Sequence, residues 1–116
     1  MRDWPHPLIL AHRGASVHAP ENTLAAFELA LVQGAHGIEL DVKLSADGEV
    51  VVFHDATLER TTNGQGKVAQ QSLAALRELD AGVFFSDEFR GEKIPTLAEV
   101  FEMIGMRTII NVELTN

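Results

Sequence analysis

Residues 37–43 read Gly-Ile-Glu-Leu-Asp-Val-Lys, and this alternation decides the fold. In an extended strand the apolar residues project to one side, and Glu39 and Asp41 project to the other. The apolar side predicts a sheet face that is buried. The two carboxylates form either a solvated strand face or a cation site, because burying them without partners is expensive.

A strand and a helix are predicted before this stretch. The apolar run Leu8-Ile9-Leu10-Ala11 predicts a buried strand that stops at His12. Apolar residues at helical spacing predict an amphipathic helix over residues 23–33, with Asn22 as its cap and Gly34 as its stop.

A third strand and an irregular segment are predicted after it. The turn signal at residues 46–48 leads to the β-branched run 50–53, which stops at His54. Residues 56–95 then leave the alternation of strands and helices, with turn residues around one helical stretch at 72–80.

Regular structure returns near the C-terminus. Capping-box spacing at Thr96 and Glu99 predicts a helix that ends at Gly105, and residues 108–114 predict a fourth strand. The order of elements favours a parallel α/β arrangement with crossover helices. We treat residues 1–116 as a single domain, with 56–95 inserted within it.

Chemically versatile side chains fall at the ends of the predicted strands, which in a (β/α)₈ barrel form the catalytic face. Glu39 and Asp41, with Glu113 on the last strand, would supply three oxygen ligands suited to Mg²⁺ or Ca²⁺. His12 and His54 could divide the work of general acid and general base, or each could be an ordinary residue of a loop.

The dipeptide Arg13-Gly14 offers a guanidinium for a phosphate oxygen, beside a glycine that lets the backbone approach a ligand. The dipeptide alone is weak evidence. The other three histidines lack a partner that spacing can name, and we expect no catalytic role for them: His6, His18 and His36.

Composition excludes several classes of partner. The 116 residues include 9 Lys and Arg against 17 Asp and Glu, giving a formal net charge of −8. Such a chain is repelled by nucleic acid and by anionic membrane surfaces. It has no cysteine and no apolar run long enough to insert stably in a membrane. We expect a cytoplasmic protein that binds a small molecule.

Taken together, the motifs resemble those of the glycerophosphodiester phosphodiesterase family, in order over nearly the whole chain. They are His12-Arg13-Gly14, Pro20-Glu21-Asn22-Thr23, Ala26-Phe27, Gly37–Val42, Asp47-Gly48, Val51–Asp55, Leu58–Thr62 and Ile94–Leu97. The ordered combination is far more specific than any single motif. The resemblance implies a TIM (β/α)₈ barrel that hydrolyses glycerophosphodiesters to an alcohol and glycerol 3-phosphate with a divalent metal.

The resemblance also implies roles for residues of this chain. Glu39, Asp41 and Glu113 would be the metal ligands. His12 and His54 would be the acid and base, with His12 favoured as base, and Arg13 would contact the phosphate. In the family the attacking group is the neighbouring glycerol hydroxyl, which gives a cyclic phosphate that water opens. Residues 56–95 would match the family's inserted region.

Two departures from the family pattern stand out. Thr115 occupies a position where the family usually has Lys, so one phosphate-facing charge is missing. A (β/α)₈ barrel typically needs about 250 residues, so the chain holds roughly the first half. We therefore expect it to need its missing C-terminal half or a second copy of itself, and the alternative is a non-catalytic half-barrel that retains the metal site.

Water-soluble, deacylated diesters are the predicted substrates. An enzyme acting on phospholipids with the lipid still attached is the other candidate, but the sequence contains no basic amphipathic helix for a membrane surface.

Overall fold

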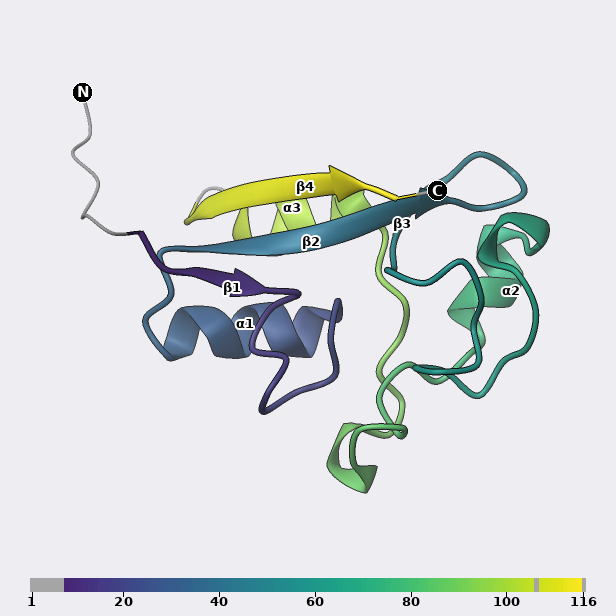
Figure 1. The fold of residues 1–116 in the computed structure, drawn as a ribbon, viewed down its shortest axis with the longest axis horizontal. Coiled ribbons are helices and arrows are strands. Elements are labelled where there is room, and N and C mark those ends of the chain that lie inside the picture. The colour runs from purple at the N-terminus through teal and green to yellow at the C-terminus, as the bar shows by residue number, and fades with distance from the viewer. Residues whose placement is uncertain (1–7, 106, 116) are drawn as a thin grey trace.

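The computed structural model describes residues 8–105 and 107–115. Its centre is β2 (Gly37–Leu44), which pairs with three other strands (Figure 1). β1 (Leu10–His12) pairs in parallel with the start of β2, and β4 (Ile109–Leu114) pairs in parallel along residues 37–42. β3 (Val50–Val52) pairs antiparallel with the end of β2.

The prediction that the third strand is parallel is wrong. Only residues 45–49 separate β2 from β3, and a parallel crossover needs about a dozen residues or more. The connection is a hairpin, closed by Gly48 at φ 82°. Val42 pairs with both Val52 and Leu114, so β3 and β4 lie on opposite edges of β2.

Two helices cover the apolar side of β2, as its alternation predicts. α1 (Leu24–Val32) lies along β1 and β2, and α3 (Leu97–Ile104) lies behind β2 and β4 (Figure 1). Together the sheet and helices bury one hydrophobic cluster, which includes Phe27, Ala30, Ile38, Leu40, Val42, Val52, Val100 and Ile104. The strands β1, β2 and β4 with these helices form two successive β–α–β units.

Helix α1 begins one residue later than its predicted cap. The Oγ1 atom of Thr23 accepts a hydrogen bond from the Ala26 backbone N–H at 3.2 Å, so Thr23 and not Asn22 is the N-cap. Gly34 follows the helix at φ 90°, which confirms it as the stop. The capping box at Thr96 and Glu99 is also confirmed at the start of α3.

The segment between β3 and α3 builds a second, smaller core. It contains the short helices η1 (Val68–Gln70), α2 (Leu73–Arg77) and η2 (Asp87–Phe89). Its buried residues are Val51, Phe53, Leu58, Val68, Leu76, Ala81 and Ile94. The helix predicted over 72–80 is therefore present but shorter, because Ser72 caps it and the chain turns after Arg77.

The polar side of the sheet carries no covering helix in the described part of the chain. Glu39 and Asp41 project from β2 on this side, and Glu113 of β4 pairs with Asp41. Both helices instead bury the opposite side, so the fold leaves this side for the candidate site.

Candidate active site

The chain changes direction sharply where β1 ends. Arg13 and Asn22 have φ values of 58° and 57°, and they are the two non-glycine residues at positive φ in residues 8–105 and 107–115. The Arg13 N–H donates to the Glu39 carbonyl at 2.7 Å, and the Asn22 N–H donates to the Arg13 carbonyl at 2.9 Å. Backbone of this kind is costly and concentrates at functional sites.

Gly14 has a role in packing. Its φ of 81° favours glycine, and an added Cβ would stand 2.8 Å from the backbone of Ala26 on α1. The glycine therefore lets the turn after β1 pack against α1. Close approach of a ligand at Gly14 stays a prediction.

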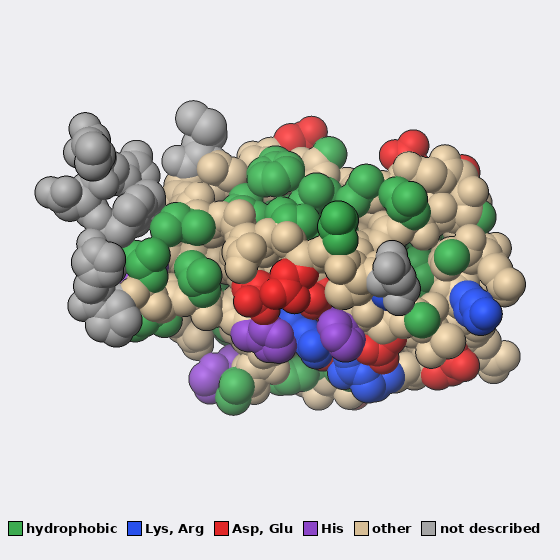
Figure 2. Space-filling model, turned by 45° about the horizontal axis from the view of Figure 1, so that its top comes forward, with side chains coloured by type: hydrophobic (Ala, Val, Ile, Leu, Met, Phe, Trp, Pro, Cys, Tyr) green, Lys and Arg blue, Asp and Glu red, His purple; other side chains and the backbone are tan. Residues whose placement is uncertain are grey.

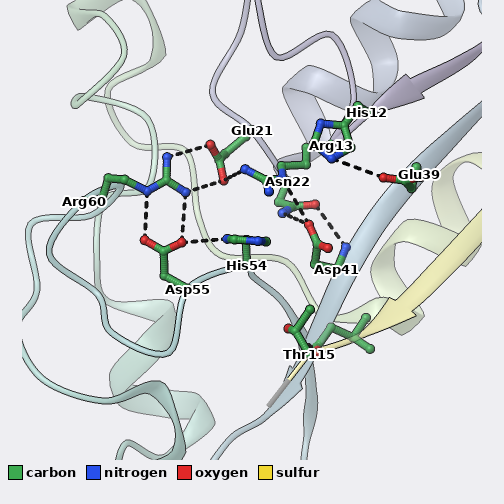
Figure 3. A network of polar contacts seen from close by, with 11 residues as sticks. His12, Arg13, Glu21, Asn22, Glu39, Asp41, His54, Asp55, Arg60 and Thr115 are labelled. Carbon is green, nitrogen blue, oxygen red and sulfur yellow. Dashed lines mark hydrogen bonds and ion pairs between the residues drawn. The ribbon is translucent and has the colours of Figure 1, made fainter.

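The two carboxylates of β2 bind different partners. Glu39 Oε1 lies 3.2 Å from His12 Nε2. Asp41 is buried, and its Oδ2 accepts a hydrogen bond from Asn22 Nδ2 at 3.1 Å and lies 3.3 Å from Arg13 Nε. The end of β1 and the turn after it are thereby held against the middle of β2 (Figure 3).

One donor in this cluster stays unsatisfied. The Nε atom of Arg13 is buried and makes no hydrogen bond to the described residues, although Asp41 Oδ2 lies 3.3 Å away as its ion-pair partner. A buried N–H without an acceptor costs about 1–3 kcal/mol.

A second cluster follows β3 and meets the first through Glu21. His54 Nδ1 lies 2.7 Å from Asp55 Oδ1, and Asp55 is paired with Arg60. The same guanidinium binds Glu21 at 2.9 and 2.8 Å. Glu21 Oε2 also contacts Arg13 at 3.4 Å, which connects the two clusters into one network (Figure 3).

The pairing with Arg60 sets the charge of Asp55. The Arg60 guanidinium, followed by the hydrogen bond from His54, lowers the pKa of the Asp55 carboxyl to about 2 against the opposing effect of burial. In turn Asp55 and Glu21 raise the pKa of Arg60 above its usual value. At neutral pH the pair is therefore fully charged.

The predicted metal ligands share a face but do not converge. Register places Glu113 beside Asp41, and Glu39 one pleat away. In the described ranges 8–105 and 107–115, no three His, Cys, Asp or Glu side chains stand close enough to hold a metal ion. Glu39 is instead turned to His12, and Asp41 to Arg13 and Asn22. The donor set remains chemically suited to a hard cation, and the metal site stays a prediction.

Thr115 continues the pairing of β4 with β2. Its N–H and Oγ1 both donate to the Val42 carbonyl, at 3.1 and 3.2 Å. It lines a cavity of about 660 Å³ together with Lys43. A lysine therefore does line this end of the sheet, from β2 rather than from β4.

The remaining histidines have other partners. His36 Nδ1 accepts a hydrogen bond from the Ile9 backbone, and His18 Nδ1 lies 3.3 Å from Gln33. His6 lies outside the described residues.

On the face of the molecule drawn in Figure 2, acidic, basic and histidine side chains gather in one band, with hydrophobic side chains beside it.

The structure brings His12, Arg13, Glu39, Asp41 and His54 to one region and adds residues that had no predicted role in the site. These are Glu21, Asn22, Asp55 and Arg60. Glu21, Asp55 and Arg60 appear in the quoted motifs as isolated charges of opposite sign, and Asn22 was predicted only as a helix cap. Which charge pairs with which depends on contacts across up to 39 residues of sequence, which spacing does not specify.

Acid–base side chains at the carboxyl ends of parallel β1 and β2 are typical of the catalytic face of a (β/α)₈ barrel. The sequence pattern of the glycerophosphoryl diester phosphodiesterase family matches residues 12–116. The chain belongs to this family.

Two curated relatives illustrate the similarity. The glycerophosphodiester phosphodiesterase of Caldanaerobacter subterraneus subsp. tengcongensis is 54% identical over 108 residues, covering 92% of this chain and 44% of the relative. That of Bacillus altitudinis is 47% identical over 110 residues, covering 93% of this chain and 45% of the relative. The chain therefore spans somewhat less than half the length of these relatives.

Solved structures agree with this fold. Glycerophosphodiester phosphodiesterase from Agrobacterium tumefaciens superposes with a TM-score of 0.90 at 50% identity, over 92% of this chain and 46% of that one. A phosphodiesterase from Oleispira antarctica, in complex with the product sn-glycerol-3-phosphate, gives 0.91 at 48% identity, over 94% and 44%. The α/β fold, as part of a TIM barrel of the phosphodiesterase type, is confirmed.

No helix in the described ranges is long and apolar enough to cross a membrane.

Proposed function

We propose that the protein hydrolyses glycerophosphodiesters to an alcohol and sn-glycerol 3-phosphate in the network described above. The observation that carries this proposal is the set of ion pairs that joins Arg13 to His54 through Glu21, Arg60 and Asp55, with the neighbouring His12 paired to Glu39. Membership of the family supports the reaction class. The Oleispira relative bound to sn-glycerol-3-phosphate supports a small-molecule phosphate ligand.

Arg13 is the proposed phosphate contact. Its buried Nε–H lacks an acceptor, and its contacts with Asp41 and Glu21 fix the guanidinium beside the strand ends. A phosphoryl oxygen would complete its hydrogen bonding and add a charge-assisted contact.

Charge balance supports a divalent cation in the working site. Five carboxylates face or adjoin the network against two guanidiniums, counting Glu21, Glu39, Asp41, Asp55 and Glu113 with Arg13 and Arg60. An anionic diester would be repelled unless positive charge were added. We propose that Glu39, Asp41 and Glu113 hold Mg²⁺ or Ca²⁺, which would polarise the phosphoryl oxygens.

His12 and His54 are the proposed acid–base pair. One imidazole takes the proton of the attacking hydroxyl, and the other gives a proton to the leaving alkoxide. His12 is the favoured base, and its Nε2 lies 3.2 Å from Glu39 Oε1. His54 would then be the acid in its imidazolium form, which gives a proton from Nε2 and is left as the Nδ1–H tautomer.

The test is release of sn-glycerol 3-phosphate from glycerophosphocholine by the purified chain, with and without Mg²⁺ or Ca²⁺. We expect metal-dependent turnover that His12→Ala lowers by about 100-fold or more. His36→Ala is the matched control, since His36 contacts only the Ile9 and Thr108 segments in the described structure. Turnover that survives His12→Ala would contradict the assigned site.

Calorimetric titration separates the metal site from catalysis. We expect Mg²⁺ or Ca²⁺ to bind the chain, and Asp41→Asn to weaken that binding. No heat at millimolar metal would remove the ligand assignment for this chain. A chain that binds metal without turnover would indicate a half-barrel that retains the metal site and lacks the rest of the active site.

A cytoplasmic location, and assembly with a second copy or with the rest of a barrel, stay predictions. The net charge of −8 is the reason for expecting no nucleic acid among the partners, and this too stays a prediction.

A further inference from the structure

The protonated nitrogen of His54 is fixed by its neighbour. His54 Nδ1 lies 2.7 Å from Asp55 Oδ1, and an ionised carboxylate can only accept a hydrogen bond. Nδ1 must therefore carry a proton, which leaves Nε2 as the nitrogen that can exchange a proton with a ligand. The orientation of the Asp55 carboxylate thus decides the tautomer.

Asp55 is in turn held by Arg60 through two contacts. Arg60 Nε donates to Oδ2 at 2.8 Å, and a terminal nitrogen donates to Oδ1 at 3.1 Å. A two-point contact of this kind fixes the plane of the carboxylate as well as its position. Without it, the Asp55 side chain could rotate away from the imidazole.

Arg60 is anchored on its far side by Glu21. Two more hydrogen bonds, at 2.9 and 2.8 Å, join the guanidinium to both oxygens of Glu21. The Glu21 side chain is only 14% exposed, and it also contacts Arg13. Glu21, in the loop before α1, therefore restrains Arg60, in the segment after β3.

We propose that Glu21, Arg60 and Asp55 act as a positioning chain that holds His54 in the Nδ1–H tautomer, with Arg60 as its central residue. The tautomer of His54 is a property of the folded protein and does not depend on the proposed function. Only the expected effect on turnover rests on that function. Arg60 is a positioning residue, since it acts through Asp55. The Glu21 carboxylate contacts Arg13 as well as Arg60. It therefore positions both the proposed phosphate contact and, through Arg60 and Asp55, the proposed proton donor His54.

The direct test is the ¹⁵N chemical shifts of the His54 ring at a pH where the imidazole is neutral. We expect the wild type to show protonated Nδ1 and bare Nε2. Arg60→Gln should shift the ring nitrogens toward a mixture of both tautomers. Arg60→Lys should restore the wild-type shifts only in part, because an ammonium cannot make the two-point contact. Arg90→Gln is the matched control, removing an exposed Arg–Asp ion pair from the same segment.

Unchanged His54 shifts in Arg60→Gln would overturn the proposal. So would protonated Nε2 in the wild type. Both results are independent of turnover, so they are distinguishable from a failure of the proposed function.

Kinetics supply the second readout. If the wild type turns over, Arg60→Gln should lower kcat by about 10- to 100-fold with little change in KM, and Arg90→Gln should change neither. Loss of Arg60 that raises KM alone would contradict positioning of His54. Circular dichroism of both variants checks that the fold is retained.

Discussion

Gly14 and Arg13 form the sharpest turn of the site, and each tolerates positive φ for a different reason. Glycine has no Cβ to meet the Ala26 backbone. Arg13 is held there by hydrogen bonds of its own N–H and carbonyl to Glu39 and Asn22. The turn therefore depends on tertiary contacts as well as on local preference.

The first prediction concerns Gly14→Ala. We expect a loss of about 2–4 kcal/mol in the free energy of unfolding, from the left-handed backbone and from overpacking against Ala26. Gly48→Ala is the control, because it shares a positive φ and an added Cβ meets nothing within 4 Å. Gly48→Ala should cost about 1–2 kcal/mol. Equal losses in urea unfolding would show that packing on α1 is unimportant.

The second prediction concerns pH. The pKa of Asp55 is about 2 in the folded chain, below its ordinary value of 3.8, so its ionised form stabilises the fold. This stabilisation is complete above about pH 4 and disappears as pH falls through about 2. Wild type should therefore melt higher than Asp55→Asn at pH 6, and the two Tm values should converge toward pH 2.

The control for that experiment is Asp87→Asn, which removes a carboxylate from an exposed ion pair with Arg90. Exposed pairs contribute about 0–1 kcal/mol. A Tm difference for Asp55→Asn that stays constant from pH 6 to pH 2 would show that the ionised carboxylate is not the source of the stability.

At the scale of elements, the start of α1 shows how a cap and a site residue divide their work. Thr23 caps the helix and also donates to the Pro20 carbonyl at 2.7 Å. Asn22, released from capping, turns its amide to Asp41. The site therefore uses the residue that local preference would have assigned to the helix.

The third prediction tests this division. Thr23→Val keeps the shape and removes the hydroxyl, so it should destabilise the fold by about 1–2 kcal/mol more than Thr23→Ser, which keeps it. Denaturant unfolding of both variants measures the difference. If the two variants unfold at the same denaturant concentration, the hydroxyl does not cap α1.

Sequence alone predicted the elements that depend on local pattern. Alternation located β2, helical spacing located α1, and the Thr96 and Glu99 pair located the start of α3. It missed the direction of β3, because a buried parallel strand and a buried hairpin strand are both apolar. The feature that distinguishes the two is the short loop between β2 and β3. It also missed the contacts of Arg60. One guanidinium binds two acidic residues at different distances along the chain, and spacing does not specify such a pairing.

For the whole molecule, the outer edge of β4, like that of β1, is left without a strand partner in the described residues. β4 pairs only with β2 there, and Leu114 is 87% exposed. Unpaired strand edges with apolar side chains favour association with another strand. This is the physical basis for expecting either the rest of a barrel or a second copy along β4.

The fourth prediction is that the 12.7 kDa chain sediments as a species heavier than a monomer at micromolar concentration. Leu114→Lys should weaken this association, because it places a charge on the β4 edge. Val32→Lys is the control, being 76% exposed at the end of α1. A monomer at every concentration would contradict association through this edge.

The strand β3 and the residue after it, Phe53, contribute alternate side chains to two different cores. Val52 belongs to the cluster under the sheet, while Val51 and Phe53 belong to the cluster of the following segment. Amide hydrogen exchange should therefore show β3, α2 and α3 opening in one cooperative event rather than as separate subdomains. Any replacement of residues 56–95, in evolution or by design, would have to supply new apolar partners for Val51 and Phe53. The segment therefore cannot be deleted without exposing part of a hydrophobic core.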